Sequence, residues 1–338
     1  MTNPILVTLT RGALDESIHR GALAVVRPGG EIACEIGDVS MPHFTRSAIK
    51  ALQAIPLVES GAAAAFGLNQ QELALACASH SGEPDHLEGV RSLLAKCGLD
   101  EAALACGAQW PLGIEAARAL VAAGERPRPI HNNCSGKHAG MLGVAVHRGE
   151  ETSGYEQQDH PVQRSIAEVL ADMAGVELTP DLIGMDGCSV PTWALPLQAM
   201  ARAFARFGTG DDLAASRQAA CRELMSACFA EPFYVAGTRR FCTGVMSKLP
   251  ARAFVKAGAE GVYCASLPES GLGVALKIDD GAKRAAEAVM VAALEALLPS
   301  SRKDLRGVWD GRLTNWRGAI TGETRVSSQL QDALKGAG

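Results

Sequence analysis

The hydrophobic pattern changes its period twice along this chain, and these changes constrain the fold more than any other feature. Near the N-terminus the pattern is typical of strands at Ile5 to Arg11, at Ala22 to Val26 and at Glu31 to Ile36, with a turn at Pro28 to Gly30. From Ser47 onward the apolar spacing becomes helical. The first segment therefore predicts a β-hairpin that leads directly into a helix.

The middle of the chain, roughly residues 60 to 245, is typical of a series of short helices. Asn69 followed by Glu72 is the pattern of a capping box. Proline at the first helical position predicts a helix from Pro84 to Cys97 and another from Pro191 to Phe207. We expect this region to form a helical layer.

Strand-like segments return near the C-terminus, at Ala253 to Lys256, Gly271 to Ile278 and Ala319 to Val326, with a helix predicted from Lys283 to Leu297. The pattern predicts an α/β (α+β) fold in which both chain ends build one antiparallel sheet. The sheet would use about 1–45 and 250–330, and the helical region about 46–249.

Domain organisation follows from what the sequence lacks. No repeat of 20 to 50 residues is visible, and no segment rich in proline, glycine and serine separates two halves. We therefore expect a single catalytic domain over 1–338.

Composition narrows the class of protein. The chain carries 37 acidic and 32 basic residues, with no basic stripe of the kind that binds nucleic acid. The N-terminus resembles no signal peptide, and no stretch approaches the roughly 18 apolar residues of a membrane span. A cytoplasmic protein is expected, without nucleic-acid or membrane partners. Its 10 cysteines are scattered singly, which indicates reduced core residues.

The first motif with chemical meaning is Ser47-Ala48-Ile49-Lys50, at the start of the helix that follows the hairpin. Positions i and i+3 of a helix share a face, so the Lys50 amine would reach the Ser47 hydroxyl. A serine becomes a good nucleophile when a base takes its proton, and a lysine with a lowered pKa can be that base. The tetrapeptide is common by chance, however. Taken alone, it is better explained as a capping serine followed by a solvated lysine.

A second cation strengthens the catalytic interpretation. Lys256-Ala257-Gly258 ends a predicted strand far downstream, and a Ser-x-x-Lys helix with a downstream Lys-x-Gly strand is the layout of penicillin-recognising enzymes and serine-dependent glutaminases. A positive charge near Lys50 would help to keep its amine neutral. Taken alone, Lys256 is better explained as an exposed lysine at a strand end.

A loop of small polar residues, Cys77 to Glu83, separates two predicted helices. Such loops commonly place hydroxyl groups at a cleft, which makes Ser79 a candidate. Ser81 precedes Glu83 and Pro84 and is also explained as a helix cap. His80 is consistent with either a site residue or a surface histidine.

Two further stretches are dense in hydrogen-bonding and ligand-type residues, His131 to His138 and Gly184 to Ser189, and each is expected to precede a helix. Cys134 and Cys188 lie far apart in the chain and do not form the paired pattern of a structural zinc site. From spacing alone, buried thiols or a substrate-lining loop explain them better than a metal does.

These motifs together closely resemble the class 3, rhizobial-type L-asparaginases. The resemblance is carried by Phe44 to Lys50, Ala78 to Glu83, His131 to Met141 and Gly184 to Cys188, and it extends from the first strand to the C-terminal helix. The threonine nucleophiles of the two better-known asparaginase groups have no counterpart in this sequence.

The resemblance implies a fold like that of serine β-lactamases and glutaminases, a homodimer, and hydrolysis of L-asparagine to aspartate and ammonia. It also implies two Ser-Lys pairs and one zinc ion per chain that modulates substrate binding. By motif, the pairs are Ser47 with Lys50 and Ser79 with Lys256; the pocket is lined by Arg46, His138 and Asp186; and zinc is held by Cys134, Lys137 and Cys188.

One departure from the family pattern affects Lys256, because Ala257 replaces the hydroxyl residue usual in Lys-Thr-Gly or Lys-Ser-Gly. Three alternatives to an asparaginase remain. They are a serine-dependent glutaminase, a β-lactamase-like hydrolase, and a non-catalytic protein of this fold that binds zinc or an amino acid. Ammonia release from asparagine and turnover of a chromogenic β-lactam would separate them.

Overall fold

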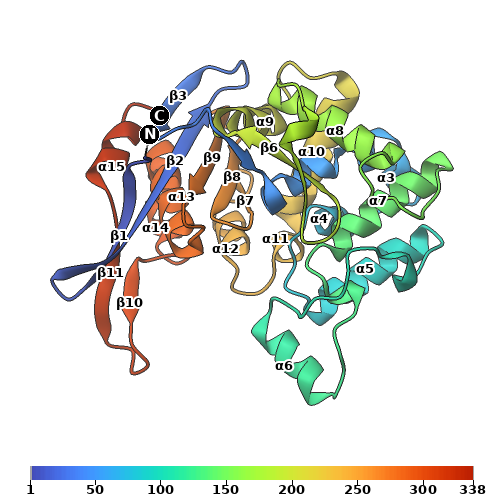
Figure 1. Cartoon of the computed structure of the whole chain (residues 1–338), viewed down its shortest axis with the longest axis horizontal. Helices are drawn as coiled ribbons and strands as arrows, with labels where there is room; N and C mark the ends of the chain where they lie inside the picture. The colour runs from blue at the N-terminus through green and yellow to red at the C-terminus, as the bar shows by residue number, and fades with distance from the viewer. Residues whose placement is uncertain (1, 338) are drawn as a thin grey trace. The chain divides into compact units, whose positions relative to one another are not determined.

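The computed structural model describes residues 2–337, which form two compact units coloured along the chain in Figure 1. Unit 1 comprises residues 2–48, 195–209 and 244–337; unit 2 comprises residues 49–194 and 210–243. No helix in the described part of the chain is both long and apolar enough to cross a bilayer. The single catalytic domain expected from the sequence stays a prediction.

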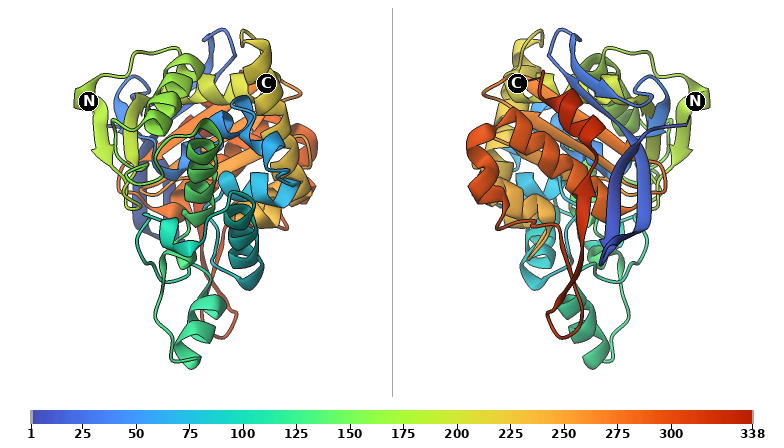
Figure 2. Two further views of the ribbon diagram at one scale, coloured as in Figure 1. Left: turned by 90° about the vertical axis from the view of Figure 1, so that its right-hand side faces the viewer. Right: turned by 90° about the vertical axis from the view of Figure 1, so that its left-hand side faces the viewer.

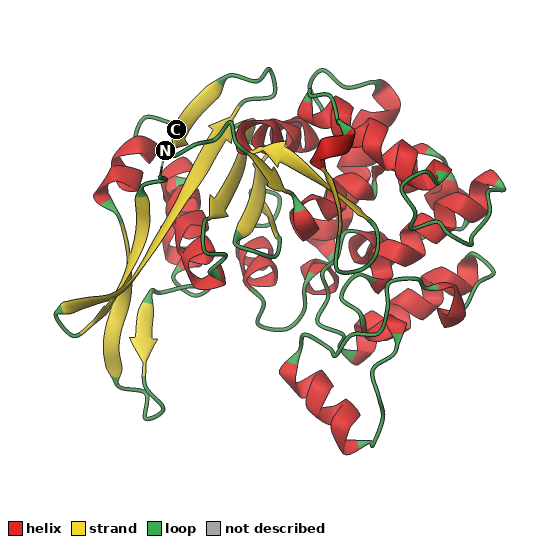
Figure 3. Cartoon of the chain, viewed as in Figure 1, coloured by secondary structure: helices red, strands yellow, loops and turns green. Residues whose placement is uncertain are grey.

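Unit 1 is built on an antiparallel sheet with the strand order β10-β11-β1-β2-β9-β8-β7, and β3 pairs with β2 beside this path (Figure 3). Both chain ends contribute strands, which confirms the predicted α/β architecture. The strands of this unit are β1 Ile5–Arg11, β2 Leu14–Val26, β3 Ile32–Ile36, β4 Pro42–Phe44, β7 Phe254–Ala257, β8 Val262–Leu267, β9 Leu272–Ile278, β10 Arg312–Thr314 and β11 Ile320–Val326.

The centre of this sheet is the core of unit 1. Every residue of β8 is buried, and in β9 only Lys277 is partly exposed, so both faces of these strands are covered. Helices α9 and α13 pack against them. The helices of this unit are α9 Leu197–Thr209, α13 Lys283–Leu297, α14 Arg302–Leu305 and α15 Ser328–Leu334 (Figure 2).

Unit 2 is mainly helical, as predicted for the middle of the chain. Its helices are α1 Lys50–Gln53, α2 Ile55–Glu59, α3 Ala62–Ala65, α4 Gln70–Ala76, α5 Pro84–Lys96, α6 Ile114–Ala122, α7 Ser135–Arg148, α8 Pro161–Ala174, α10 Ala215–Ala230 and α11 Pro232–Val235. Helix α12, Phe241–Lys248, carries the chain from unit 2 into unit 1. The capping box of Asn69 and Glu72 at the start of α4 is confirmed.

Two predictions for this region were wrong. Residues Pro191–Pro196 form strand β6, not a helix, and β6 pairs with β5, Ile183–Met185. A helix over this segment would place Pro196 in its interior, where the missing N–H and the ring clash break the helical ladder. Helix α9 therefore begins only at Leu197. For the same reason Gly184 to Ser189, which begin within β5, lead into strand β6 and do not precede a helix.

Helix α7 packs on α4 at very short range, which brings its N-terminus to the end of α4. Gly136 makes this approach possible, because a Cβ atom at this position would lie 2.4 Å from the carbonyl oxygen of Leu75. The flanking residues Cys134 and Lys137 are thereby held near the loop that follows α4.

We expect Gly136→Ala to lower the free energy of unfolding by about 1–3 kcal/mol, because the new methyl group meets backbone and not a flexible side chain. Denaturation by urea measures this change. Gly29→Ala is the control, since nothing lies within 4 Å of a Cβ there. Equal stability of the two variants would show that the α4 and α7 backbones can move apart.

Candidate active site

Ser47 lies at the start of a short 3-10 helix, Arg46–Ile49, that continues into α1. Arg46, directly before it, has a φ of 47° although it is not glycine. Residues held in the left-handed region are uncommon and cluster at functional sites. The sequence predicted a helix start at Ser47; the structure adds a strained residue next to the candidate nucleophile.

The end of strand β7 lies beside this turn within unit 1. A Cβ atom on Gly258 would be 3.2 Å from the backbone nitrogen of Ala48, so only glycine allows this approach without movement. The neighbouring Lys256 is 1% exposed and donates to the carbonyl of Ala257 at 3.1 Å. Lys256 is therefore a buried lysine and not the exposed strand-end residue that was the alternative.

Lys50 is completely buried in unit 2, where it is surrounded by oxygen atoms. Its Nζ lies 2.7 Å from the carbonyl oxygen of Ala78, 2.9 Å from Ser79 Oγ and 3.1 Å from Asn133 Oδ1. A buried amine without such partners would cost several kcal/mol. The structure thus joins two predicted residues, Lys50 and Ser79; the pairings of Ser47 with Lys50 and of Ser79 with Lys256 stay predictions.

Backbone hydrogen bonds fix the loop that carries Ser79. The Ser79 amide donates to Val235 O at 3.0 Å, and the next amide, of His80, donates to Asn133 O at 3.2 Å. His80 is buried, and its Nε2 lies 2.9 Å from Ser135 Oγ. Its role is to tie this loop to the start of α7, which excludes the surface position considered from the sequence.

The three predicted zinc ligands converge in unit 2. Lys137 Nζ lies 3.1 Å from Cys188 Sγ, and Cys188 shares a hydrogen bond with Cys134. Asp186 Oδ2 is 3.8 Å from the Cys188 sulfur. All three ligand side chains are buried. Ser189, which follows Cys188, has a φ of 75° and is a second strained residue beside the predicted site.

Electrostatics distinguish the two sulfur atoms. The hydrogen bond with Cys188 lowers the pKa of Cys134 well below its usual range, although burial opposes this shift. The same hydrogen bond, together with burial, raises the pKa of Cys188. Burial lowers the pKa of Lys137, but Cys188, Cys134 and Asp186 raise it above its usual value overall. Cys134 is therefore the first of these thiols to ionise.

The predicted ligands would offer zinc an unusual set of donor atoms, the sulfurs of Cys134 and Cys188 and the amine of Lys137. Within residues 2–337, no group of three or more His, Cys, Asp or Glu side chains is placed to hold a metal. Any zinc here would thus depend on Lys137 as the third ligand. Thiolates are common zinc ligands, whereas a lysine must lose its proton to bind, so binding would release protons.

His138, predicted to line the pocket, is held by a tyrosine. Its Nδ1 lies 2.6 Å from the Tyr155 hydroxyl, which also accepts a hydrogen bond from the Ala105 amide at 3.0 Å. The Tyr155 hydroxyl can donate to Nδ1 or accept from it, because one accepted bond leaves it a hydrogen and a second lone pair. His138 Nε2 is buried and has no hydrogen-bond partner within residues 2–337. It is a polar atom available to a bound molecule.

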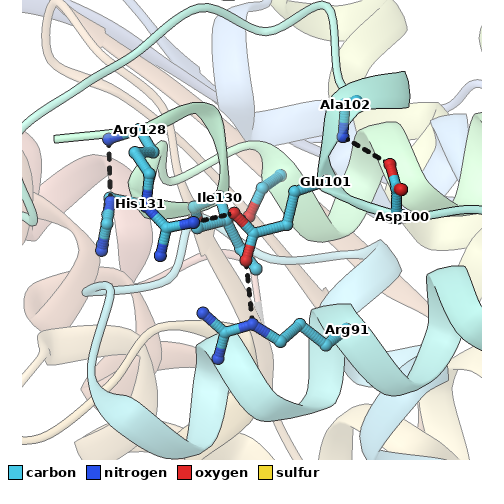
Figure 4. A network of polar contacts seen from close by, with 8 residues as sticks. Arg91, Asp100, Glu101, Ala102, Arg128, Ile130 and His131 are labelled. Carbon is cyan, nitrogen blue, oxygen red and sulfur yellow. Dashed lines mark hydrogen bonds and ion pairs between the residues drawn. The ribbon is translucent and has the colours of Figure 1, made fainter.

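A salt-bridge network anchors the segment that leads into this region (Figure 4). Glu101 accepts from Arg91 Nε at 2.9 Å and from Arg128, and the Arg128 amide donates to His131 Nδ1 at 2.9 Å. These contacts fix the 3-10 turn Pro129–His131, from which the chain continues to Cys134. His131 is structural in this arrangement.

The sequence analysis missed three residues of the site. Asn133 belongs to the motif that carried the family resemblance, but its contact with Lys50 gave no signal. Gln109 binds Asn133, and Tyr155 binds His138, from loops without a recognisable motif. In the sequence, only their chemistry as hydrogen-bonding residues was visible.

The sequence profile of the family described as L-asparaginase II matches residues 7–326. The chain belongs to the L-asparaginase II family. Its members are amidohydrolases that act on a linear amide, so the chain is an L-asparaginase, and the resemblance drawn from the motifs is confirmed. No curated protein matches the chain.

Solved structures similar to the chain include a β-lactamase from Mycobacterium bovis, with 16% identity over 85% of this chain and 94% of that one, and a TM-score of 0.42. Mglu in its tris and glutamate form has 17% identity, with 89% and 63% covered and a TM-score of 0.38. Simvastatin synthase (LovD) from Aspergillus terreus has 10% identity, with 77% and 86% covered and a TM-score of 0.34. At sequence identities and TM-scores this low, the matches give no information about the substrate or the mechanism of this chain.

We expect the asparaginase to lose stability as the pH falls below about 6.5, the pKa of an unfolded histidine. Burial lowers the pKa values of His80, His86 and His138 in the folded state. As the pH falls, the histidines of the unfolded chain therefore bind protons before those of the folded chain. The free energy of unfolding then decreases by about 1.4 kcal/mol per histidine and pH unit, until the folded histidines also bind protons. Urea midpoints at pH 8 and pH 5.5 measure this; a midpoint that stays constant would contradict it.

Proposed function

We propose that the chain hydrolyses the side-chain amide of L-asparagine through a Ser-Lys acyl-enzyme. The observation that supports this mechanism best is Lys50, a fully buried amine 2.9 Å from the hydroxyl of Ser79. A lysine held away from water and next to a serine hydroxyl is the arrangement in which an amine serves as a base. Ser47, three residues before Lys50 in the chain, is the nucleophile of this proposal.

The reaction has two stages. In the first, the serine oxygen bonds to the amide carbon, and its proton passes through Ser79 to Lys50, with Lys256 assisting the transfer. Backbone N–H groups stabilise the oxyanion. The C–N bond then breaks as Lys50 returns the proton to nitrogen, and ammonia leaves. In the second, water attacks the acyl ester and loses its proton to the same base, which returns it to the serine oxygen as the C–O bond breaks and aspartate leaves.

Substrate orientation is assigned to Arg46, His138 and Asp186. An arginine recognises the α-carboxylate, a carboxylate recognises the α-amino group, and His138 Nε2 is available to a further polar group of the substrate. A pocket that fixes both α-groups holds the amide at one distance from the serine. The extra methylene of glutamine would displace that carbon, and a shift of about 1 Å can cost about a hundredfold in rate.

Zinc is assigned to Cys134, Lys137 and Cys188, whose donors converge as described above. When bound, the ion would supply a fixed point that positions the loops of His138 and Asp186, with two thiolates limiting its strength as a Lewis acid. The nucleophile in this proposal remains a serine.

We also propose that the enzyme acts in the cytoplasm as a homodimer. Exposed apolar side chains gather at and just before α6, where Ile114 is 64% and Val121 61% exposed, with Trp110 and Leu112 nearly half exposed. Exposed apolar residues in a group are typical of protein interfaces. Sedimentation that shows a single species of one chain's mass would refute the dimer.

Two alternatives are tested by substrate. A serine-dependent glutaminase would show comparable kcat/KM for glutamine and asparagine, and a β-lactamase-like hydrolase would turn over a chromogenic β-lactam. A non-catalytic zinc- or amino-acid-binding protein would release no ammonia from either amide.

Removal of the nucleophile or the base should abolish ammonia release from asparagine without unfolding the protein. Ser47→Ala is expected to lower kcat by at least about a thousandfold, and Lys50→Met to do the same near pH 7. Ser165→Ala and Lys303→Met are matched controls on α8 and α14 that should keep wild-type turnover. A folded Ser47→Ala enzyme with normal turnover would move the nucleophile to Ser79.

Zinc should be present at about one ion per chain, measured by elemental analysis of purified enzyme. Cys134→Ser and Cys188→Ser are each expected to lose it and to raise KM more than they lower kcat, while Cys221→Ser, a buried thiol of α10, should retain it. Chelated enzyme should remain active at saturating asparagine. Loss of kcat on chelation, with substrate binding intact, would contradict the positioning role.

A further inference from the structure

The side chain of Asn133 lies between the predicted base and the predicted metal site. Its Oδ1 is 3.1 Å from Lys50 Nζ and 3.4 Å from Cys134 Sγ, and its Nδ2 is 2.8 Å from Gln109 Oε1. The sequence analysis gave Asn133 no role. It nevertheless contacts Lys50, the base on which the proposed chemistry depends.

The orientation of the Asn133 amide is fixed by its neighbours. The backbone N–H of Asn133 donates to Gln109 Oε1 at 3.3 Å. Because a backbone N–H can only donate, the Gln109 atom facing Asn133 must be oxygen. The side-chain atom of Asn133 that bonds the same oxygen must then be the nitrogen, Nδ2. Its Oδ1 consequently faces Lys50 as an acceptor that cannot donate.

This orientation determines where the Lys50 lone pair points. Two of the three oxygen atoms around Nζ, those of Ala78 and Asn133, are amide oxygens and can only accept. The third, Ser79 Oγ, can also donate. A neutral amine has two N–H bonds and one lone pair. When both N–H bonds go to the two amide oxygens, the lone pair is left facing the Ser79 hydroxyl.

The sulfur of Cys134, which also borders Lys50, does not upset this assignment. Cys134 Sγ lies 3.4 Å from Asn133 Oδ1, an oxygen that can only accept, so the thiol hydrogen is directed to Asn133 and not to Lys50. Ser79 therefore remains the neighbour that can donate a hydrogen to Lys50.

We propose that Asn133, held by Gln109, is a positioning residue that directs the lone pair of Lys50 to the hydroxyl of Ser79. The inference rests on the proposed function for the role of Lys50 as a base, but it concerns the orientation of the amine. Without the Asn133 oxygen, an N–H of Lys50 can turn toward Ser79, and the amine then faces that hydroxyl as a donor and not as a base.

The test compares variants by two independent readouts. The first is kcat and KM for asparagine. The second is the rate at which a fluorophosphonate labels the nucleophilic serine, mapped by mass spectrometry. In labelling, the serine oxygen bonds to phosphorus, the P–F bond breaks, fluoride leaves, and the serine proton passes to the base. This second readout requires the activated serine but not asparagine.

Asn133→Ala should lower kcat and the labelling rate by about a hundredfold, with KM changed by less than about threefold. Gln109→Leu, which frees the Asn133 amide to rotate, should lower both rates about tenfold. Gln109→Glu keeps an oxygen facing Asn133 and should restore most of the rate. Asn69→Ala, which removes the cap of α4, is the structural control and should lower stability without changing either rate.

The outcomes separate the two proposals. Labelling of Asn133→Ala at the wild-type rate, or equal losses in Asn133→Ala and Asn69→Ala, would overturn the role of Asn133. Gln109→Glu as impaired as Gln109→Leu would overturn the orientation argument. Wild-type enzyme that is labelled but releases no ammonia, with labelling still slowed in Asn133→Ala, would refute asparagine hydrolysis and leave the positioning role standing.

Discussion

The burial of Lys50 is the interaction on which the rest of the site depends. An amine removed from water loses several kcal/mol of hydration, and the loss has to be offset by hydrogen bonds in fixed directions. Two segments far from Lys50 in sequence supply them, namely the loop of Ala78 and Ser79 and the segment before α7 that carries Asn133. The requirement to satisfy one amine thus holds these segments together and places the chemistry at their junction.

The surrounding packing serves the same end. Gly136 lets α7 approach α4 closely enough for Asn133 to reach Lys50, and the Ser79 amide is tied to Val235. Farther out, the network around Glu101 fixes the turn that precedes Asn132. Each contact is local and modest in energy, but together they leave the Lys50 amine a single geometry. Rigid placement of this kind is what a reaction that depends on proton transfer over about 3 Å requires.

Much of this arrangement could be predicted from the sequence. The rest could not, and the physical reasons can be identified. Alternation of apolar residues identified β1 and β9, and proline and capping patterns identified α4 and α5, because these signals act over a few residues. Strand β6 was missed because proline at position 191 also suits a helix start. The contact of Asn133 with Lys50 spans 83 residues of chain, and no local pattern encodes such a distance. Motif resemblance named Lys50 and Ser79, which the structure brings into contact, but not Asn133 or Gln109 beside them.

All ten cysteines are buried thiols outside any disulfide, and this affects how the enzyme loses activity irreversibly. Unfolding would expose ten thiols at once, and in the presence of oxygen or metal traces the unfolded chain would become cross-linked in many different pairings before it could refold. The lifetime of the active protein is then set by the rate at which the native state unfolds and not by the equilibrium free energy of unfolding. A reductant would extend the working lifetime of a preparation without altering a single contact of the folded enzyme.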